Sequence, residues 1–132
     1  MRSNLRVAQP PSKPLLIFDG ECRFCRQCVG HWRRLAGGAV DYQPFQEPVL
    51  AVQYPEIPRS QYEAAAQLIV PDGRVYSGAE AVFRSLAYDP RRRWLARRYD
   101  SSPLFARLCE WAYRFVSRHR AVFSWEITRA GN

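Results

Sequence analysis

Two cysteines separated by two residues, Cys22 and Cys25, directly follow an apolar segment that ends in Asp-Gly. The apolar segment predicts a strand, the Asp-Gly pair a tight turn, and the residues after Cys22 a helix. A helix N-terminus stabilises negative charge, and thiolate is the reactive form of cysteine. Arg23 adds a positive charge beside the first cysteine. We therefore expect Cys22 to be a nucleophile whose thiolate is favoured by Arg23.

Cys25 lies one helical turn further along, on the side expected to face the core. Cys22 would attack a substrate disulfide to form a mixed disulfide, which Cys25 would then cleave. The alternative is a pair of unreactive thiols that happen to lie close together. Asp19, at the end of the predicted strand, has two interpretations. Its carboxyl group relays a proton to or from Cys25, or it only closes the turn by bonding to its own backbone.

The series continues with Cys28 and His31 at the same spacing, a pattern that also suggests a zinc or iron–sulfur site. On a regular helix each three-residue step rotates the side chain by about −60°, so these two residues diverge from Cys22. We therefore expect Cys28 to fill the core as a small apolar side chain. We also expect the protein to use no metal and no cofactor. The alternative metal-ligand set is Cys22, Cys25, Cys28 and either His31 or Cys109.

The elements that must position these thiols follow in the order strand, helix, strand, hairpin, helices. Strands are predicted at 14–18, at 39–45 and in the two arms of a hairpin over 67–77. Helices are predicted at 22–36, 79–88 and 91–99, and only short helices fit among the prolines of 46–64. Ser102 caps a last helix that starts at Pro103 and is expected to bury Leu104, Phe105, Leu108, Ala112, Phe115 and Val116.

This order of elements is typical of one fold class. We predict an α/β fold, a thioredoxin-like three-layer sandwich with a small mixed sheet and an added C-terminal helical segment. That fold carries its redox pair at the N-terminus of the first helix. We expect a disordered lead-in over 1–13, a single domain over 14–125 and a C-terminal tail over 126–132.

Charge and composition limit the choice of partners. The 132 residues carry a net charge of +8, spread along the chain. A solvated charged face is therefore favoured over nucleic-acid or acidic-surface binding, and Trp94 and Trp111 are expected to pack helices together. A non-catalytic interaction module with a basic, aromatic C-terminal half is an alternative to an enzyme. No stretch approaches the roughly 20 apolar residues of a membrane span. The four cysteines, without a signal-peptide pattern, favour reactive thiols in the cytoplasm.

The segment 18–25, with Asp19, Cys22 and Cys25, resembles the defining motif of the DCC family of thiol–disulfide oxidoreductases. The stretches 70–81 and 111–120 are similar to the family's second block and to its C-terminal tyrosine–arginine helix. The resemblance implies a thioredoxin-like fold and a redox-active cysteine pair, with Asp19 as the third motif residue. It implies a disulfide or dithiol substrate, either a protein or a small molecule, without naming it.

One departure from thioredoxin itself concerns the substrate groove. Thioredoxins place a cis-proline just before the first hairpin strand, opposite the dithiol, where it presents backbone to the substrate. In this chain that position falls near Ala65 or Ala66, and Pro58 is too far upstream. The sequence therefore does not support a substrate groove of the thioredoxin type.

Overall fold

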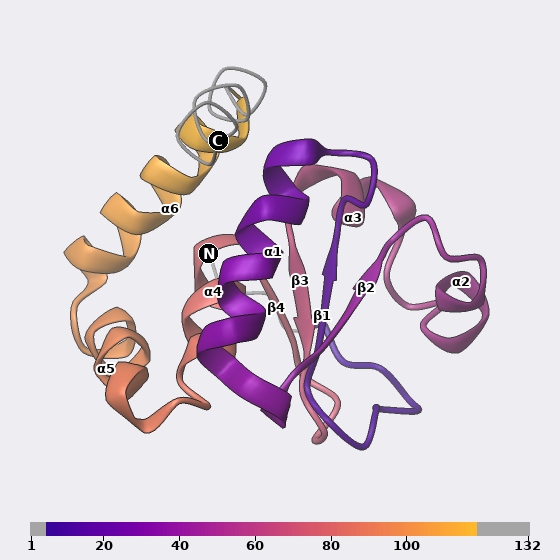
Figure 1. Cartoon of the computed structure of the whole chain (residues 1–132), viewed down its shortest axis with the longest axis horizontal. Coiled ribbons are helices and arrows are strands. Elements are labelled where there is room, and N and C mark those ends of the chain that lie inside the picture. Colours follow the sequence, from indigo (N-terminus) through magenta and orange to yellow (C-terminus); the bar gives the residue numbers. More distant parts are fainter. Residues whose placement is uncertain (1–4, 119–132) are drawn as a thin grey trace.

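The computed structural model describes residues 5–118, which are built around a four-stranded mixed sheet (Figure 1). The strands, in the spatial order β2-β1-β3-β4, are β1 (Leu15–Phe18), β2 (Asp41–Pro44), β3 (Gln67–Ile69) and β4 (Val75–Ser77). β1 pairs parallel with β2 and antiparallel with β3, and β3 pairs antiparallel with β4. The parallel pair requires a crossover, which helix α1 (Arg23–Ala36) provides.

The helices of the described residues follow the predicted order. After α1 come α2 (Val49–Gln53), α3 (Arg59–Ala64), α4 (Gly78–Leu86), α5 (Arg93–Ser101) and α6 (Pro103–Arg118), with short 3-10 turns at η1 (Gly37–Ala39) and η2 (Pro90–Arg92). The segment with several prolines holds only the two short helices α2 and α3, as predicted. The Ser102 hydroxyl accepts the N–H of Phe105 at 3.2 Å, which confirms the predicted cap of α6.

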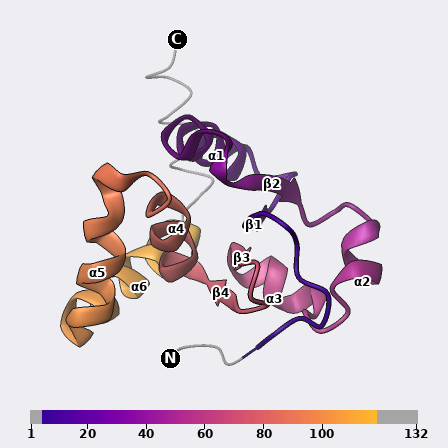
Figure 2. The same cartoon turned by 90° about the horizontal axis from the view of Figure 1, so that it is seen from below.

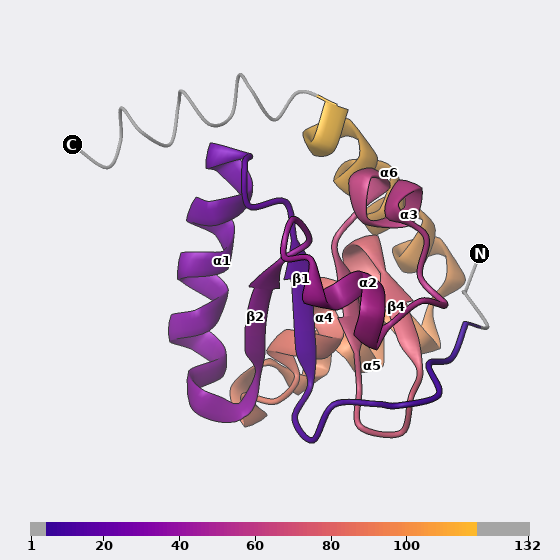
Figure 3. The same ribbon diagram turned by 90° about the vertical axis from the view of Figure 1, so that its right-hand side faces the viewer.

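The molecule has three layers, with α1 and α4 on one face of the sheet and α2 and α3 on the other (Figures 2 and 3). Successive residues of β1 point to opposite faces. Leu16 packs with Ala36 and Ala81 on the face covered by α1 and α4, whereas Ile17 packs with Leu50 on the face covered by α2 and α3. The thioredoxin-like α/β fold is therefore confirmed, and the buried β1 is the strand that leads to the two cysteines.

The predicted disordered lead-in over 1–13 is wrong for its inner part. The N–H of Val7 donates to the carbonyl of Gly73 at 2.8 Å, and the N–H of Val75 donates to the carbonyl of Leu5 at 3.1 Å. Val7 is only 6% exposed, because it joins the core on the α2 and α3 face. These residues thus lie along β4 as part of the domain. The predicted domain end at 125 and the tail over 126–132 lie outside the described residues.

The predicted buried face of α6 is also wrong in part. Leu104, Leu108 and Phe115 are exposed by 68%, 58% and 47%, and Trp111, expected to pack helices together, is exposed by 67%. Trp94 on α5 is likewise exposed. Apolar residues occur on two faces of α6, so the sequence pattern alone could not show which face meets the rest of the protein. No helix within the described residues is long and apolar enough to cross a membrane.

Candidate active site

Cys22 occupies the N-cap position of α1, immediately before the first helical residue. Its backbone is extended, with φ −88° and ψ 117°, and its sulfur accepts the backbone N–H of Cys25 at 3.3 Å. The first N–H groups of a helix have no partner within the helix, and the helix dipole adds partial positive charge there. Cys22 and Cys25 are both half-buried residues. The Cys22 sulfur is thus held where a thiolate gains most from the backbone.

The loop before Cys22 is fixed by Gln46, a residue that the sequence analysis missed. Its side-chain amide donates to Asp19 Oδ1 at 2.8 Å, and its Oε1 accepts the N–H of Gly20 at 2.9 Å. Gln46 follows β2, which is parallel to β1, and the carboxyl ends of parallel strands meet at one edge of a sheet. That rule, applied to the residues after each predicted strand, would have found it.

Gly20 is required by the close approach of this loop to β2. A Cβ atom at Gly20 would lie 2.5 Å from the Cβ of Pro44 and 3.0 Å from Gln46 Oε1. Asp19 Oδ1 also accepts the N–H of Glu21 at 3.0 Å, the local hydrogen bond expected of an Asp-Gly turn. Asp19 therefore closes the turn, and in addition it lies in the wall of a pocket together with Cys25.

Two arginines flank the cysteines. Arg23, which we expected to act on Cys22, has an exposed side chain at the first position of α1. Arg26, which the sequence analysis did not single out, donates through Nη1 to the carbonyl of Gly20 at 2.7 Å. This bond ties the first turn of α1 to the loop, so the positive charge on the exposed side of the helix start comes from both arginines.

Of the alternative metal ligands, Cys28 and Cys109 line the same pocket as Cys25, and His31 does not. Burial, together with the charge of Cys22, raises the pKa of the Cys28 thiol to about 11, and burial also raises the pKa of the Cys109 thiol. His31 is exposed on α1, where its ring lies 3.3 Å from the guanidinium of Arg34. Among residues 5–118, no three His, Cys, Asp or Glu side chains are placed so that they could hold a metal ion.

The segment 64–66, where thioredoxin has its cis-proline, lines the same pocket as Cys25. No cis peptide bond occurs in the described part of the chain, and Ala65 is extended, with φ −165° and ψ 161°. The side-chain amide of Gln67, which is fully buried, donates to the carbonyls of Ala65 and Gln61 at 3.0 Å each. Its Oε1 accepts the amide of Gln61 at 2.8 Å and the hydroxyl of Ser77 at 2.6 Å. A buried glutamine therefore fixes the conformation of this segment.

Helix α6 covers the same segment. The hydroxyl of Tyr113 accepts the N–H of Ala66 at 2.9 Å, and the carbonyl of Ala66 accepts the N–H of Gly78 at 3.0 Å. Between α6 and the cysteines lies a pocket of about 330 Å³. Its wall is mostly apolar and includes Phe18, Phe24, Cys25, Cys28, Trp32, Val82, Phe83, Cys109, Ala112 and Val116.

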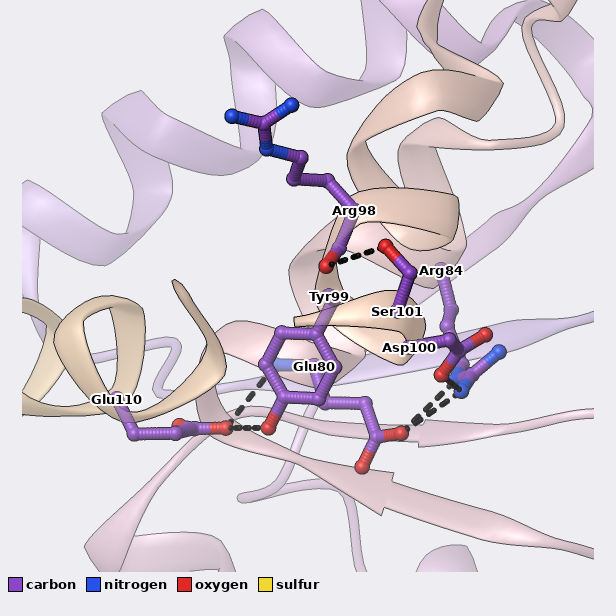
Figure 4. Close-up of polar contacts among 7 residues, drawn as sticks. All are labelled: Glu80, Arg84, Arg98, Tyr99, Asp100, Ser101 and Glu110. Atoms are coloured by element: carbon purple, nitrogen blue, oxygen red, sulfur yellow. Dashed lines mark hydrogen bonds and ion pairs between the residues drawn. The ribbon is translucent and has the colours of Figure 1, made fainter. Parts of the chain in front are cut away.

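Glu110 locks α6 onto the N-terminus of α4 (Figure 4). Its carboxylate accepts the N–H groups of Ala79 at 3.0 Å and Glu80 at 3.4 Å, and the hydroxyl of Tyr99. This is a favourable place for an anion, because the dipole of α4 is positive there. Gly78 allows the approach: its φ is +65°, and a Cβ would lie 2.7 Å from Glu110 Oε1. The position of the pocket's cover is thus set by Glu110 and Tyr113 together.

The fold and the placement of the cysteine pair define a thioredoxin-like α/β protein with a C-x2-C pair at the start of its first helix. Residues 16–126 match the model of the DCC1-like thiol-disulfide oxidoreductase family. The chain therefore belongs to this family, and the resemblance seen in its motifs is confirmed. Searches among curated proteins and among solved structures gave no match.

Proposed function

We propose that the protein exchanges thiols and disulfides through Cys22 and Cys25. The observation that carries the proposal is the bond from the N–H of Cys25 to the sulfur of Cys22 at the helix N-cap. A negatively charged sulfur gains more from such a donor than a neutral thiol does. Cys22 is therefore the attacking group, and membership of the DCC1-like family supports this chemistry.

In the proposed reaction the Cys22 thiolate attacks one sulfur of a disulfide, releases the other as a thiol and forms a mixed disulfide. Cys25 then loses its proton and attacks the Cys22 sulfur. The second substrate thiol leaves, and the Cys22–Cys25 disulfide remains, so the protein loses two electrons and the substrate gains them. Asp19 lines the same pocket as Cys25, and its carboxylate is the proposed proton acceptor. The thiols favour a reducing compartment, and we propose the cytoplasm.

Single-turnover exchange tests this assignment. The pre-reduced protein is mixed with a small pyridyl disulfide, and released thiopyridone is followed by absorbance. We expect Cys22→Ser to abolish the rapid release. Cys25→Ser should stop at a mixed disulfide on Cys22, visible as added mass. Cys109→Ser, which leaves the pair intact, is the control. Rapid release that survives Cys22→Ser would refute the assignment of the nucleophile.

A second candidate function, binding to an anionic membrane surface, is favoured by the exposed face of α6. Leu104, Leu108, Trp111 and Phe115 are all exposed and recur every three or four residues, so they share one side of the helix. Arg107, Arg114 and Arg118 run beside them. An apolar stripe beside arginines is typical of helices that lie in the headgroup region of acidic bilayers.

Co-sedimentation with vesicles tests this second function. We expect retention on phosphatidylserine-containing vesicles, weaker retention on phosphatidylcholine alone, and loss of retention for Trp111→Ser. Trp94→Ser removes a tryptophan of similar exposure from α5 and is the matched control. Equal binding of the Trp111→Ser variant, or retention on nucleic acid but not on lipid, would contradict a membrane role for this face.

A further inference from the structure

The backbone opposite the dithiol is already bonded within the chain. An extended peptide is held by main-chain hydrogen bonds to an open backbone segment. Here the N–H of Ala65 donates to the carbonyl of Gln61 at 3.2 Å, and the N–H of Ala66 donates to the hydroxyl of Tyr113 at 2.9 Å. A peptide substrate would have to displace both bonds, and α6 with them. This segment is therefore poorly suited to bind polypeptide.

What lies open to the dithiol instead is the apolar pocket. Its volume of about 330 Å³ is at the lower end of the range of about 300–1,000 Å³ for small-molecule sites. Alanine, valine and aromatic side chains make most of its wall. Of the two carboxylates in the wall, Asp19 is held by Gln46, and Glu63 is paired with Arg59 at 3.0 Å. The remaining wall favours an apolar group over a charged one.

The pocket adjoins the cysteine pair through Cys25. Cys25 is part of its wall, and the Cys22 sulfur lies 3.3 Å from the backbone nitrogen of Cys25. A substituent attached to the Cys22 sulfur in a mixed disulfide therefore starts next to the pocket. Tyr113 and Val116 of α6 are also part of the wall, so α6 limits the space open to that substituent.

We propose that the substrate is a small-molecule disulfide with an apolar aliphatic or aromatic substituent, which occupies this pocket while its sulfur is bonded to Cys22. The proposal rests on the exchange reaction proposed above. The Cys22 thiolate forms the new S–S bond, the other half of the substrate leaves as a thiol, and Cys25 then releases the pocketed half as a second thiol. A dithiol reductant returns the pair to its reduced form.

The experiment uses two probes that differ only in the substituent, benzyl 2-pyridyl disulfide and hydroxyethyl 2-pyridyl disulfide. The single-turnover rate of the reduced full chain with each probe is divided by the rate of the same probe with free 2-mercaptoethanol. This division corrects for the difference in intrinsic reactivity between the two probes. We expect a preference of about tenfold or more for benzyl, because burial of an aromatic side chain typically stabilises by about 1.5–3 kcal/mol. Insulin should be reduced far more slowly.

Ala112→Trp narrows the pocket from α6, and Ala51→Trp makes the same change at an exposed position of α2, outside the pocket. We expect Ala112→Trp to bring the benzyl rate down to the hydroxyethyl rate, and Ala51→Trp to leave both rates unchanged. Exchange with equal normalised rates for the two probes, or faster reduction of insulin, would overturn the proposed substrate class alone. Failure of the wild-type protein to react with either probe would instead overturn the exchange function. The preference of the wild-type protein does not depend on the folding of any variant.

Discussion

Replacement of Glu110 by glutamine should release α6 from the pocket without removing any apolar side chain. The carboxylate accepts two N–H groups from the start of α4 and the hydroxyl of Tyr99. Glutamine keeps one oxygen but presents an amide N–H₂ to one of these donors, so at least one charge-assisted bond of about 1.5–3 kcal/mol is lost. The lost interaction with the dipole of α4 adds about 0.3–1 kcal/mol. The two losses sum to about 2–4 kcal/mol, and we expect the lower part of that range, about 2–3 kcal/mol, because Glu110 is only half-buried.

Two measurements test this estimate. Thermal unfolding should shift down by about 6–12 °C for a chain of this size, whereas Glu47→Gln, the same change at an exposed position, should leave the midpoint unaltered. Amide hydrogen exchange should speed up at Ala66, whose N–H is bonded to Tyr113 on α6, before it does in β1. If Glu110→Gln shifted stability no more than Glu47→Gln, the assignment of Glu110 as the anchor of α6 would be refuted.

Three further predictions concern the residues around the cysteine pair. Gly20→Ala should lower the free energy of unfolding by about 1–3 kcal/mol, because the new Cβ would lie 2.5 Å from Pro44. Gly30→Ala on α1, where the Cβ would meet open space, should raise it by about 0.5–1 kcal/mol. Equal denaturation midpoints for the two variants would contradict this. Gln46→Ala should slow single-turnover exchange severalfold and change its pH profile, since Asp19, the proposed proton acceptor, loses its hydrogen bond from Gln46; an unaltered profile would exclude a positioning role for Gln46. Burial raises the pKa of Cys28 from 9.0 to about 11, so the unfolded chain loses this proton first and the free energy of unfolding should fall between pH 9 and 11. The fall should be smaller by about 1–2 kcal/mol, a value discounted for partial exposure, in Cys28→Ala than in the wild-type protein when both are followed by urea titration. Burial also raises the pKa of Cys109, Tyr42 and Tyr62, so part of the fall remains in the variant.

The sequence was most informative where the signal is local. The Asp-Gly turn, the apolar run of β1 and the helix that follows fix the position of Cys22 at the N-cap, and all three are visible in consecutive residues. Gln46 was missed because its role comes from the parallel pairing of β1 with β2, which joins residues 26 or more positions apart. Leu108 was misplaced for a related reason: α6 has apolar residues on two sides, and its docking is decided by polar contacts of Glu110 and Tyr113.

The sequence near Ala65 does not support a substrate groove of the thioredoxin type, and the structure shows how this segment is held without a cis-proline. The turn opposite a dithiol must be held in one conformation and its polar groups must be satisfied. A cis-proline fixes the chain and leaves neighbouring backbone groups for a peptide. Here the buried Gln67 side chain donates to the Ala65 carbonyl, and the Tyr113 hydroxyl accepts the Ala66 N–H. These two hydrogen bonds fix the segment, but they also occupy backbone groups that a peptide would need, which supports the proposed small-molecule substrate.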